Sequence, residues 1–285
     1  MHGALYRHIT RIMSDLTFIK MHGLGNDFVI LDARMGAISV GVQQIQYLAD
    51  RRFGIGCDQI LIIEPASSDG ADFYLRIFNA DGGEIDACGN GTRCVAFLVM
   101  KEFGVQEVKI QTNAGILKSK LIDDGRVALD MGQAKFHWRD IPLAQKADTL
   151  ALDLSFGVLS SPAVVNVGNP HAIFFVDNLE SVALEEIGSE IENHAMFPER
   201  TNVEVAQILT NDSIRLKVWE RGVGITQACG TGACATLVAA SRRSLTSRSA
   251  TVILDGGALD VEWKDDNHTV MIGPVETIFT GVIKL

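Results

Sequence analysis

The chain has no long hydrophobic segment. None of its apolar runs approaches the roughly 20 residues that are needed to span a bilayer. Residues 1–11 are basic, but they contain neither the apolar stretch nor the small-residue cleavage site of a secretory signal. We therefore expect a cytoplasmic protein without a membrane partner. We interpret residues 1–12 as an extended start or a tail ahead of the folded part.

Positive charge is also scarce. The 285 residues include 25 lysines and arginines against 35 aspartates and glutamates, which gives a net charge of −10. Such a chain repels phosphate backbones, and its short Arg242-Arg243 pair does not offset that repulsion, so nucleic acid is not expected as a partner. The apolar share of 47% supplies material for more than one core, and the length fits two domains.

The chain contains few cysteines, and their number is odd. Five cysteines in a chain of this size do not form a disulfide framework, so we expect free thiols in a reducing compartment. Five residues separate Cys88 from Cys94, which exceeds the usual spacing of about two to four in a zinc pair. Neither this pair nor the pair Cys229 and Cys234 is accompanied by histidines in the sequence order of a zinc motif. The sequence therefore predicts no metal site.

The most informative feature that is present is an internal repeat. Residues 87–91 (ACGNG) return as residues 228–232 (ACGTG), so that Cys229 lies 141 positions after Cys88. Upstream, residues 75–78 (LRIF) return as residues 216–219 (LKVW) at the same offset. The repeat predicts a duplicated strand, loop and helix start, with one cysteine at the mouth of each glycine turn.

The repeat also predicts the domain organisation. We expect an N-terminal domain of residues 13–132 and 275–285 that carries Cys88, and a C-terminal domain of residues 133–274 that carries Cys229. The last segment is assigned to the first domain because a duplicated protein often exchanges its terminal strand.

Hydrophobic periodicity supplies the elements within each half. Helical spacing is found in four segments, residues 42–49, 91–103, 184–191 and 232–245. Gly104 is a candidate terminator of the second helix, and the small residues of the fourth predict a tightly enclosed helix. The remaining apolar runs predict strands, including a last one over residues 278–285.

The two repeated cysteines suggest acid/base chemistry. A thiolate is both a base and a nucleophile, and a helix N-terminus is expected to lower its pKa because unpaired N–H groups favour the anion. Gly89, Gly91, Gly230 and Gly232 leave backbone N–H groups free to hold a carboxylate. One sulfur on each face of an α-carbon could remove a proton while the other delivers one, which inverts the centre. The alternative is that both are core cysteines beside tight turns.

Ordered motifs around these cysteines resemble the diaminopimelate epimerase family from about residue 16 to the end of the chain. They are residues 20–28 (KMHGLGNDF), 79–84 (NADGGE), 87–94 (ACGNGTRC), 168–171 (GNPH) and 220–224 (ERGVG) followed by 229–232 (CGTG). The related proline racemases usually have histidine where this chain has Asn90, which favours the epimerase. Cys57 departs from the family pattern, which commonly has a bulky residue there, and we interpret it as structural.

The resemblance implies a fold and an activity. The fold is α/β, with two pseudo-symmetric domains, each a mixed β-sheet curled around a central α-helix. The activity is a cofactor-independent conversion of LL-diaminopimelate to the meso form, in lysine and peptidoglycan precursor biosynthesis. The family also implies a homodimer.

The resemblance assigns roles motif by motif. Cys88 and Cys229 become the acid/base pair, with His171 and Glu220 tuning their pKa values. The reacting carboxylate is assigned to Gly89, Asn90, Gly230 and Thr231. Contacts with the rest of the substrate are assigned to Asn26, Gln59, Asn79, Asn169, Asn202, Glu220 and Arg221.

Several of these residues have a simpler interpretation. Asn26 and Asn169 beside glycines suit turns, His171 suits a satisfied core position, and Glu220 with Arg221 suits an exposed pair at a strand end. At the level of function, the alternatives are a proline or hydroxyproline epimerase, a thiol redox protein, and a non-catalytic amino-acid-binding protein.

Overall fold

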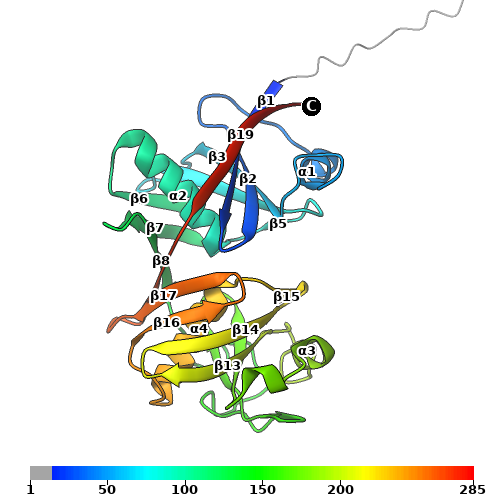
Figure 1. Cartoon of the computed structure of the whole chain (residues 1–285), viewed down its shortest axis with the longest axis vertical. Coiled ribbons are helices and arrows are strands. Elements are labelled where there is room, and N and C mark those ends of the chain that lie inside the picture. Colours follow the sequence, from blue (N-terminus) through cyan, green and yellow to red (C-terminus); the bar gives the residue numbers. More distant parts are fainter. Residues whose placement is uncertain (1–14) are drawn as a thin grey trace, which may run out of the picture.

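A computed structural model describes residues 15–285 as two halves stacked along the long axis of the molecule (Figure 1). Residues 1–14 lie outside the described part, and with them the expected tail and the first two residues of the expected N-terminal domain. Among the helices of residues 15–285, none combines the length and apolar character that crossing a membrane requires.

The first half contains eight strands and two helices. They are β1 (Asp15–Gly23), β2 (Asn26–Asp32), α1 (Val42–Ala49), β3 (Gln59–Pro65), β4 (Phe73–Asn79), β5 (Glu84–Ile85), α2 (Gly89–Phe103), β6 (Glu107–Thr112), β7 (Gly115–Leu121) and β8 (Val127–Gln133). The β1–β2 turn needs a residue in the left-handed region, which Gly25 supplies with φ 82°.

The second half repeats this plan after a short hairpin, and the chain ends in β19. Its elements are β9 (Ser155–Phe156), β10 (Leu159–Ser160), β11 (Ala163–Asn166), β12 (Pro170–Phe175), the 3₁₀ turn η1 (Leu179–Ser181), α3 (Leu184–Glu192), β13 (Asn202–Thr210), β14 (Ser213–Glu220), β15 (Gly224–Thr226), α4 (Gly230–Arg242), β16 (Ser249–Leu254), β17 (Gly257–Trp263), β18 (His268–Gly273) and β19 (Glu276–Lys284).

Strand pairing confirms the pseudo-symmetry. In the first half β1 and β2 are antiparallel, β2 and β3 parallel, β3 and β4 antiparallel, and β4 and β6 parallel. In the second half β11, β12, β13, β14 and β16 show the same succession of pairings. The expected mixed sheet in each half is therefore confirmed.

Each half surrounds a central helix. α2 buries Val95 and Val99 against a core of strand residues, and it ends where Gly104 adopts the left-handed conformation with φ 64°, as the sequence predicts. α4 is buried along nearly its whole length, so its alanines allow the surrounding strands to approach closely. Burying one Val side chain contributes about 1.5–3 kcal/mol, so the enclosed faces of these helices add to the stability of each core.

The two halves are joined by strands from both. β8 pairs antiparallel with β18, and β19 returns to pair antiparallel with β1, from Asp15 opposite Lys284 to His22 opposite Glu276. Figure 1 shows β19 running from the second half back along the first. The expected return of the last strand to the first half is thus observed.

A few elements differ from the sequence prediction. β5, β15 and the β9–β10 hairpin were not predicted, because two or three residues are too few to show alternation. α4 ends at Arg242 rather than at residue 245, and both central helices begin two residues earlier than predicted, directly after the repeated cysteines.

Candidate active site

The repeated cysteines occupy equivalent positions. Cys88 is the N-cap of α2 and Cys229 the N-cap of α4, both with extended backbone (φ −142° and −123°). Cys88 is half-buried, whereas Cys229 is buried and its sulfur lies 3.4 Å from both the Gly232 amide nitrogen and the Thr231 hydroxyl oxygen. Each cysteine therefore starts a helix whose first amides can face an anion.

The two helix starts meet at Met271. A Cβ atom on Gly89 would lie 2.2 Å from Cε of Met271, and one on Gly230 would lie 2.7 Å from its Sδ. Nδ2 of Asn90 also donates to the carbonyl oxygen of Ala228 at 3.4 Å. The glycines are thus required for close approach, and the structure brings the two halves of the repeated motif to one place.

Burial dominates the acidity of both thiols. Desolvation raises the pKa of Cys88 to about 11, and the nearby Glu220 adds to the rise. Desolvation raises the pKa of Cys229 well above its usual value, and Glu220 and Glu204 reinforce the effect. The amides of Gly91 and Gly232 lower these pKa values, as expected for helix starts, but burial outweighs them. The prediction of lowered thiol pKa values is therefore wrong for the protein alone.

Three polar side chains of the second half are joined by hydrogen bonds, and two of them are fully buried. Nδ1 of His171 lies 2.6 Å from Oε1 of Glu204, and its Nε2 lies 2.7 Å from Oδ1 of Asn169. His171 and Glu204 are both fully buried, and the second oxygen of Glu204 has no hydrogen-bond partner among the described residues. Burial raises the pKa of Glu204, although the adjacent His171 opposes the rise.

Glu220 also lies near Cys229 and is held by Thr226. Oε1 of Glu220 accepts a hydrogen bond from the Thr226 hydroxyl at 2.5 Å. Burial raises the pKa of Glu220, while Thr226 and the charge of His171 lower it. Glu220 is thus a half-buried carboxyl group close enough to influence both cysteines, which fits the role in pKa tuning that the resemblance assigns to it.

Side-chain amides of the first half pair with one another, and one of them lies beside Cys88. Oδ1 of Asn26 lies 3.8 Å from the Cys88 sulfur and 3.4 Å from Nδ2 of Asn90. Nε2 of Gln59 donates to Oδ1 of Asn79 at 3.0 Å. Oε1 of Gln59 and Oδ1 of Asn90 are buried and have no hydrogen-bond partner within residues 15–285. Such atoms are costly unless something else satisfies them, which is typical of a ligand site.

Asn202 and Arg221 lie together, but the Asn202 side chain is occupied. Its Nδ2 donates to the Pro170 carbonyl at 2.8 Å, and its Oδ1 accepts from the Arg221 backbone N–H at 2.9 Å. The Arg221 guanidinium donates to the Glu199 carbonyl at 3.0 Å and keeps further N–H groups for a carboxylate.

Four residues of this region were missed by sequence reasoning. Glu204 is a single acid inside the apolar strand β13, a pattern that indicates a buried carboxylate with a partner. Met271 carries no polar signal. Asp58 lies in the loop of residues 54–58 that precedes β3, and Arg51 lies just before this loop. Only Gln59, the first residue of β3, was predicted to act in this segment. Cys57, Cys94 and Cys234 are buried core residues, as interpreted, and burial raises the pKa of each to about 12.

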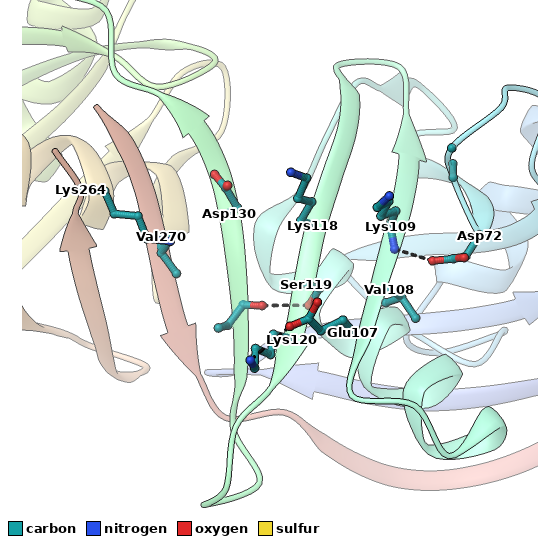
Figure 2. Close-up of a pocket in the computed structure, with 13 residues that line it drawn as sticks. Asp72, Glu107, Val108, Lys109, Lys118, Ser119, Lys120, Asp130, Lys264 and Val270 are labelled. Carbon is teal, nitrogen blue, oxygen red and sulfur yellow. Dashed lines mark hydrogen bonds and ion pairs between the residues drawn. The ribbon is translucent and has the colours of Figure 1, made fainter. Parts of the chain in front are cut away.

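A separate cavity of about 470 Å³ lies over β6, β7 and β8 and includes none of the predicted site residues. Figure 2 shows Lys109, Lys118, Lys120 and Lys264 around it, together with three acidic side chains. Lys120 is paired with Glu107 at 3.1 Å, and these side chains are exposed. Within residues 15–285, no group of three or more His, Cys, Asp and Glu side chains is arranged to hold a metal ion.

Solved structures with this architecture define the class of fold. A hydroxyproline epimerase from Agrobacterium vitis with bound trans-4-OH-L-proline matches with a TM-score of 0.69 and 14% identity, over 95% of this chain and 93% of that one. A phenazine biosynthesis protein of the PhzF family from Bacillus anthracis matches with a TM-score of 0.69 and 16% identity, over 96% and 100% of the two chains. The likeness is one of fold, the architecture of two similar halves described above.

Sequence relatives identify the family within this class of fold. The family model of diaminopimelate epimerase matches residues 18–137 and 163–278. Diaminopimelate epimerases from Rhodospirillum centenum and Acidiphilium cryptum are 53% and 51% identical, each over 93% of this chain and over 91% and 95% of their own lengths. The chain belongs to the diaminopimelate epimerase family.

Proposed function

We propose that this protein epimerises LL-diaminopimelate to meso-diaminopimelate in lysine biosynthesis, without a cofactor. The observation that carries the proposal is the placement of Cys88 and Cys229 as N-caps of two equivalent helices whose first turns both contact Met271. One thiolate takes the proton of the α-carbon and the opposite thiol gives another, so that the configuration inverts. The membership of the family and its relatives supports the substrate.

The first turns of α2 and α4 hold the reacting carboxylate in this proposal. The backbone N–H groups at Gly89, Asn90, Gly230 and Thr231 supply hydrogen bonds and the positive ends of two helix dipoles. A bound α-ammonium group would offset the rise that burial and Glu220 impose on the thiol pKa values, so that substrate binding itself favours the thiolate.

The remaining roles are those that the family resemblance assigns. His171 and Glu220 set the charge around the cysteines, and Glu220 and Arg221 contact an ammonium and a carboxylate. Asn26, Gln59, Asn79 and Asn169 present amides to the substrate. Asn202 acts through the Arg221 backbone that it holds at 2.9 Å. Neutral amides with a few charges suit a substrate that carries both ammonium and carboxylate groups.

The decisive experiment is incubation of the purified enzyme with LL-diaminopimelate in deuterated water. We expect formation of the meso isomer with deuterium at the inverted α-carbon. Proline and trans-4-hydroxyproline serve as alternative substrates in parallel reactions. Turnover of either of these without turnover of diaminopimelate would overturn the proposal, and binding of diaminopimelate without deuterium exchange would indicate a binding protein.

We also propose that the domains are residues 13–132 with 275–285 and residues 133–274, and that two copies form a homodimer. Ile278, Phe279 and Val282 of β19 are 47–60% exposed, and exposed apolar side chains of this kind are those that a second copy covers. Light scattering of wild-type protein and of Phe279→Glu checks this, because the charged variant should dissociate. A monomeric wild-type protein would contradict it.

A further inference from the structure

Two aspartates connect the loop before β3 to the start of β2. The backbone N–H of Asp58 donates to the Asp27 side chain at 2.9 Å, and the backbone N–H of Asp27 donates to Oδ2 of Asp58 at 3.1 Å. The Asp58 N–H also lies 3.0 Å from the Asp27 carbonyl oxygen. These reciprocal contacts fix Asp58 relative to Asn26, the neighbour of Asp27.

Two cations hold this pair of carboxylates in place. Nη2 of Arg51 donates to Oδ1 of Asp58 at 2.8 Å and to Oδ1 of Asp27 at 2.7 Å, and Nη1 reaches the other Asp27 oxygen at 2.9 Å. The buried Lys20 ammonium pairs with Asp27 at 2.6 Å. Burial alone would raise the pKa of Asp27, but Arg51 and Lys20 outweigh it and lower the pKa, so this carboxylate stays ionised.

Asp58 determines which way the Asn26 side chain faces. Nδ2 of Asn26 donates to Oδ2 of Asp58 at 2.9 Å. A carboxylate can only accept hydrogen bonds, so the Asn26 amide cannot turn around without losing this bond. Its oxygen is thereby directed to the other side, where it lies 3.8 Å from the Cys88 sulfur and 3.4 Å from Nδ2 of Asn90.

We infer that Asp58 is a positioning residue for Cys88: through Asn26 it holds a hydrogen-bond acceptor against the sulfur and so favours the thiol, the proton-donating form. A thiol can donate to the Asn26 oxygen, whereas a thiolate is repelled by it. The inference deepens the proposed function, on which its catalytic consequence rests. Asp58 itself does not contact the sulfur, and within the described residues its side chain bonds only Asn26, Asp27 and Arg51.

Other groups near Cys88 must be kept constant in any test. The backbone N–H groups of Asn90 and Gly91 and the charge of Arg93 favour the thiolate, whereas Glu220 favours the thiol. None of these belongs to the Asp58 loop. A substitution at Asp58 therefore changes the orientation of Asn26 while these four influences remain in place.

The test is alkylation of Cys88 by iodoacetamide across pH 8 to 11, followed by peptide mapping, because the rate reports the thiolate fraction. In Asp58→Asn the new amide can donate to the Asn26 oxygen, which lets the Asn26 N–H groups face the sulfur and favour the thiolate. We expect alkylation of Cys88 at pH 8 to be about tenfold faster, equivalent to a pKa lowered by about one unit. Asp58→Glu keeps a carboxylate and should restore the slow rate.

The matched control is Asp32→Asn. Asp32 is 43% exposed and pairs with Arg34 at 2.6 Å, whereas Asp58 is 45% exposed and pairs with Arg51 at 2.8 Å, so both variants remove a similar ion pair from the same half. Asp32→Asn should alkylate at the wild-type rate. Equal rates for Asp58→Asn and wild type would overturn the inference.

A second variant and a second readout complete the design. If Asp58→Asn does not fold, Asp58→Ser replaces the carboxylate by a hydroxyl group that can donate to the Asn26 oxygen, and a wild-type alkylation rate in that variant would overturn the inference. In turnover, Asp58→Asn should lose about tenfold in kcat in the direction that uses Cys88 as proton donor. Alkylation needs no substrate, so a wild-type enzyme that fails to epimerise diaminopimelate would overturn the proposed function alone.

Discussion

Asn90 at the start of α2 donates a hydrogen bond from its side-chain amide to the carbonyl oxygen of Ala228, which precedes Cys229, at 3.4 Å. This contact spans 138 positions of sequence and ties the first cysteine loop to the second. The Asn90 oxygen has no partner among the described residues. One residue therefore joins the two helix starts and keeps a polar atom for a ligand between them.

Replacing Cys88 or Cys229 by Ala should each reduce turnover by at least about a hundredfold, because inversion needs a proton acceptor and a proton donor on opposite faces. Steady-state kinetics with LL-diaminopimelate measures this. Cys94→Ala is the control, since Cys94 is a buried core residue of α2. Retention of more than about a tenth of wild-type turnover, less than ~1.4 kcal/mol of barrier, would rule out the two-base mechanism.

Stability should fall as the pH rises above 9. Burial raises the folded-state pKa of Cys88 to about 11 and of Cys57, Cys94 and Cys234 to about 12, from an ordinary value of 9.0. The unfolded thiols ionise first, so their stabilising contribution is complete below pH 9 and is lost as the pH rises toward 11 to 12. Each such thiol contributes a slope of up to about 1.4 kcal/mol per pH unit.

Urea unfolding at pH 8, 9 and 10 under reducing conditions measures this slope. In Cys57→Ala, the free energy of unfolding should fall less steeply between pH 9 and 10, because one thiol with a raised pKa is removed while the other four cysteines remain. An unchanged free energy of unfolding between pH 8 and 10 in the wild type would show that the buried thiols do not control the alkaline limit.

Gly230→Ala should impair both folding and turnover. Its Cβ atom would lie 2.7 Å from Sδ of Met271, which is fully buried and has little room to move. We expect a loss of about 1–3 kcal/mol of stability, typical of an overpacked core. Gly36→Ala is the control, because a Cβ there meets nothing within 4 Å.

A double-mutant cycle with Met271→Ala sharpens this prediction. Removing the Met271 side chain makes room for the new methyl group, so Gly230→Ala should cost less in that background. Thermal and urea unfolding of the four proteins give the coupling energy. Additive losses would mean that Met271 does not set the need for glycine at this position.

Glu204→Leu should destabilise the fold by about 3–5 kcal/mol, since it leaves the buried His171 without its partner at 2.6 Å. Glu204→Gln keeps a polar atom opposite His171 and should cost less. Urea unfolding compares the two variants with Glu262→Leu, which changes an exposed glutamate of β17. Equal stability of Glu204→Leu and wild type would contradict the buried pair.

Arg221→Ala should raise KM for diaminopimelate with little change in melting temperature. Its guanidinium makes one hydrogen bond within the described residues, to the Glu199 carbonyl, and retains donors for a substrate carboxylate. Arg126→Ala, which breaks surface ion pairs with Asp124 and Asp260, is the control. Unchanged KM and kcat in Arg221→Ala would show that Arg221 is a surface residue that does not contact the substrate.

Local chemistry explains how much of the fold was predictable. Gly104 marks the end of α2 because a left-handed residue is needed there, and the repeated cysteine loops mark both helix starts. The repeat alone predicted two similar halves, whereas the curled arrangement of each sheet followed from the family resemblance. The short strands β5 and β15 were missed because they depend on pairing with β4 and β14 rather than on their own sequence.

The site was predictable only in part for a related reason. The positions of Cys88 and Cys229 follow from the repeat, but their pKa values depend on how deeply the surrounding strands bury them. Glu204 lies 33 positions from His171, so no local pattern connects the two. In the same way, the hydrogen bond between Asn26 and Asp58 can form only after β2 and β3 have paired.

The return of β19 to β1 sets an order of folding during synthesis. The strand that completes the first half, residues 276–284, is synthesised after every element of the second half. The second half is nearly continuous in sequence and can close its sheet earlier. The first half, although made first, keeps one edge of β1 unpaired until β19 has been made. A chain truncated before Glu276 would expose that edge permanently to other strands.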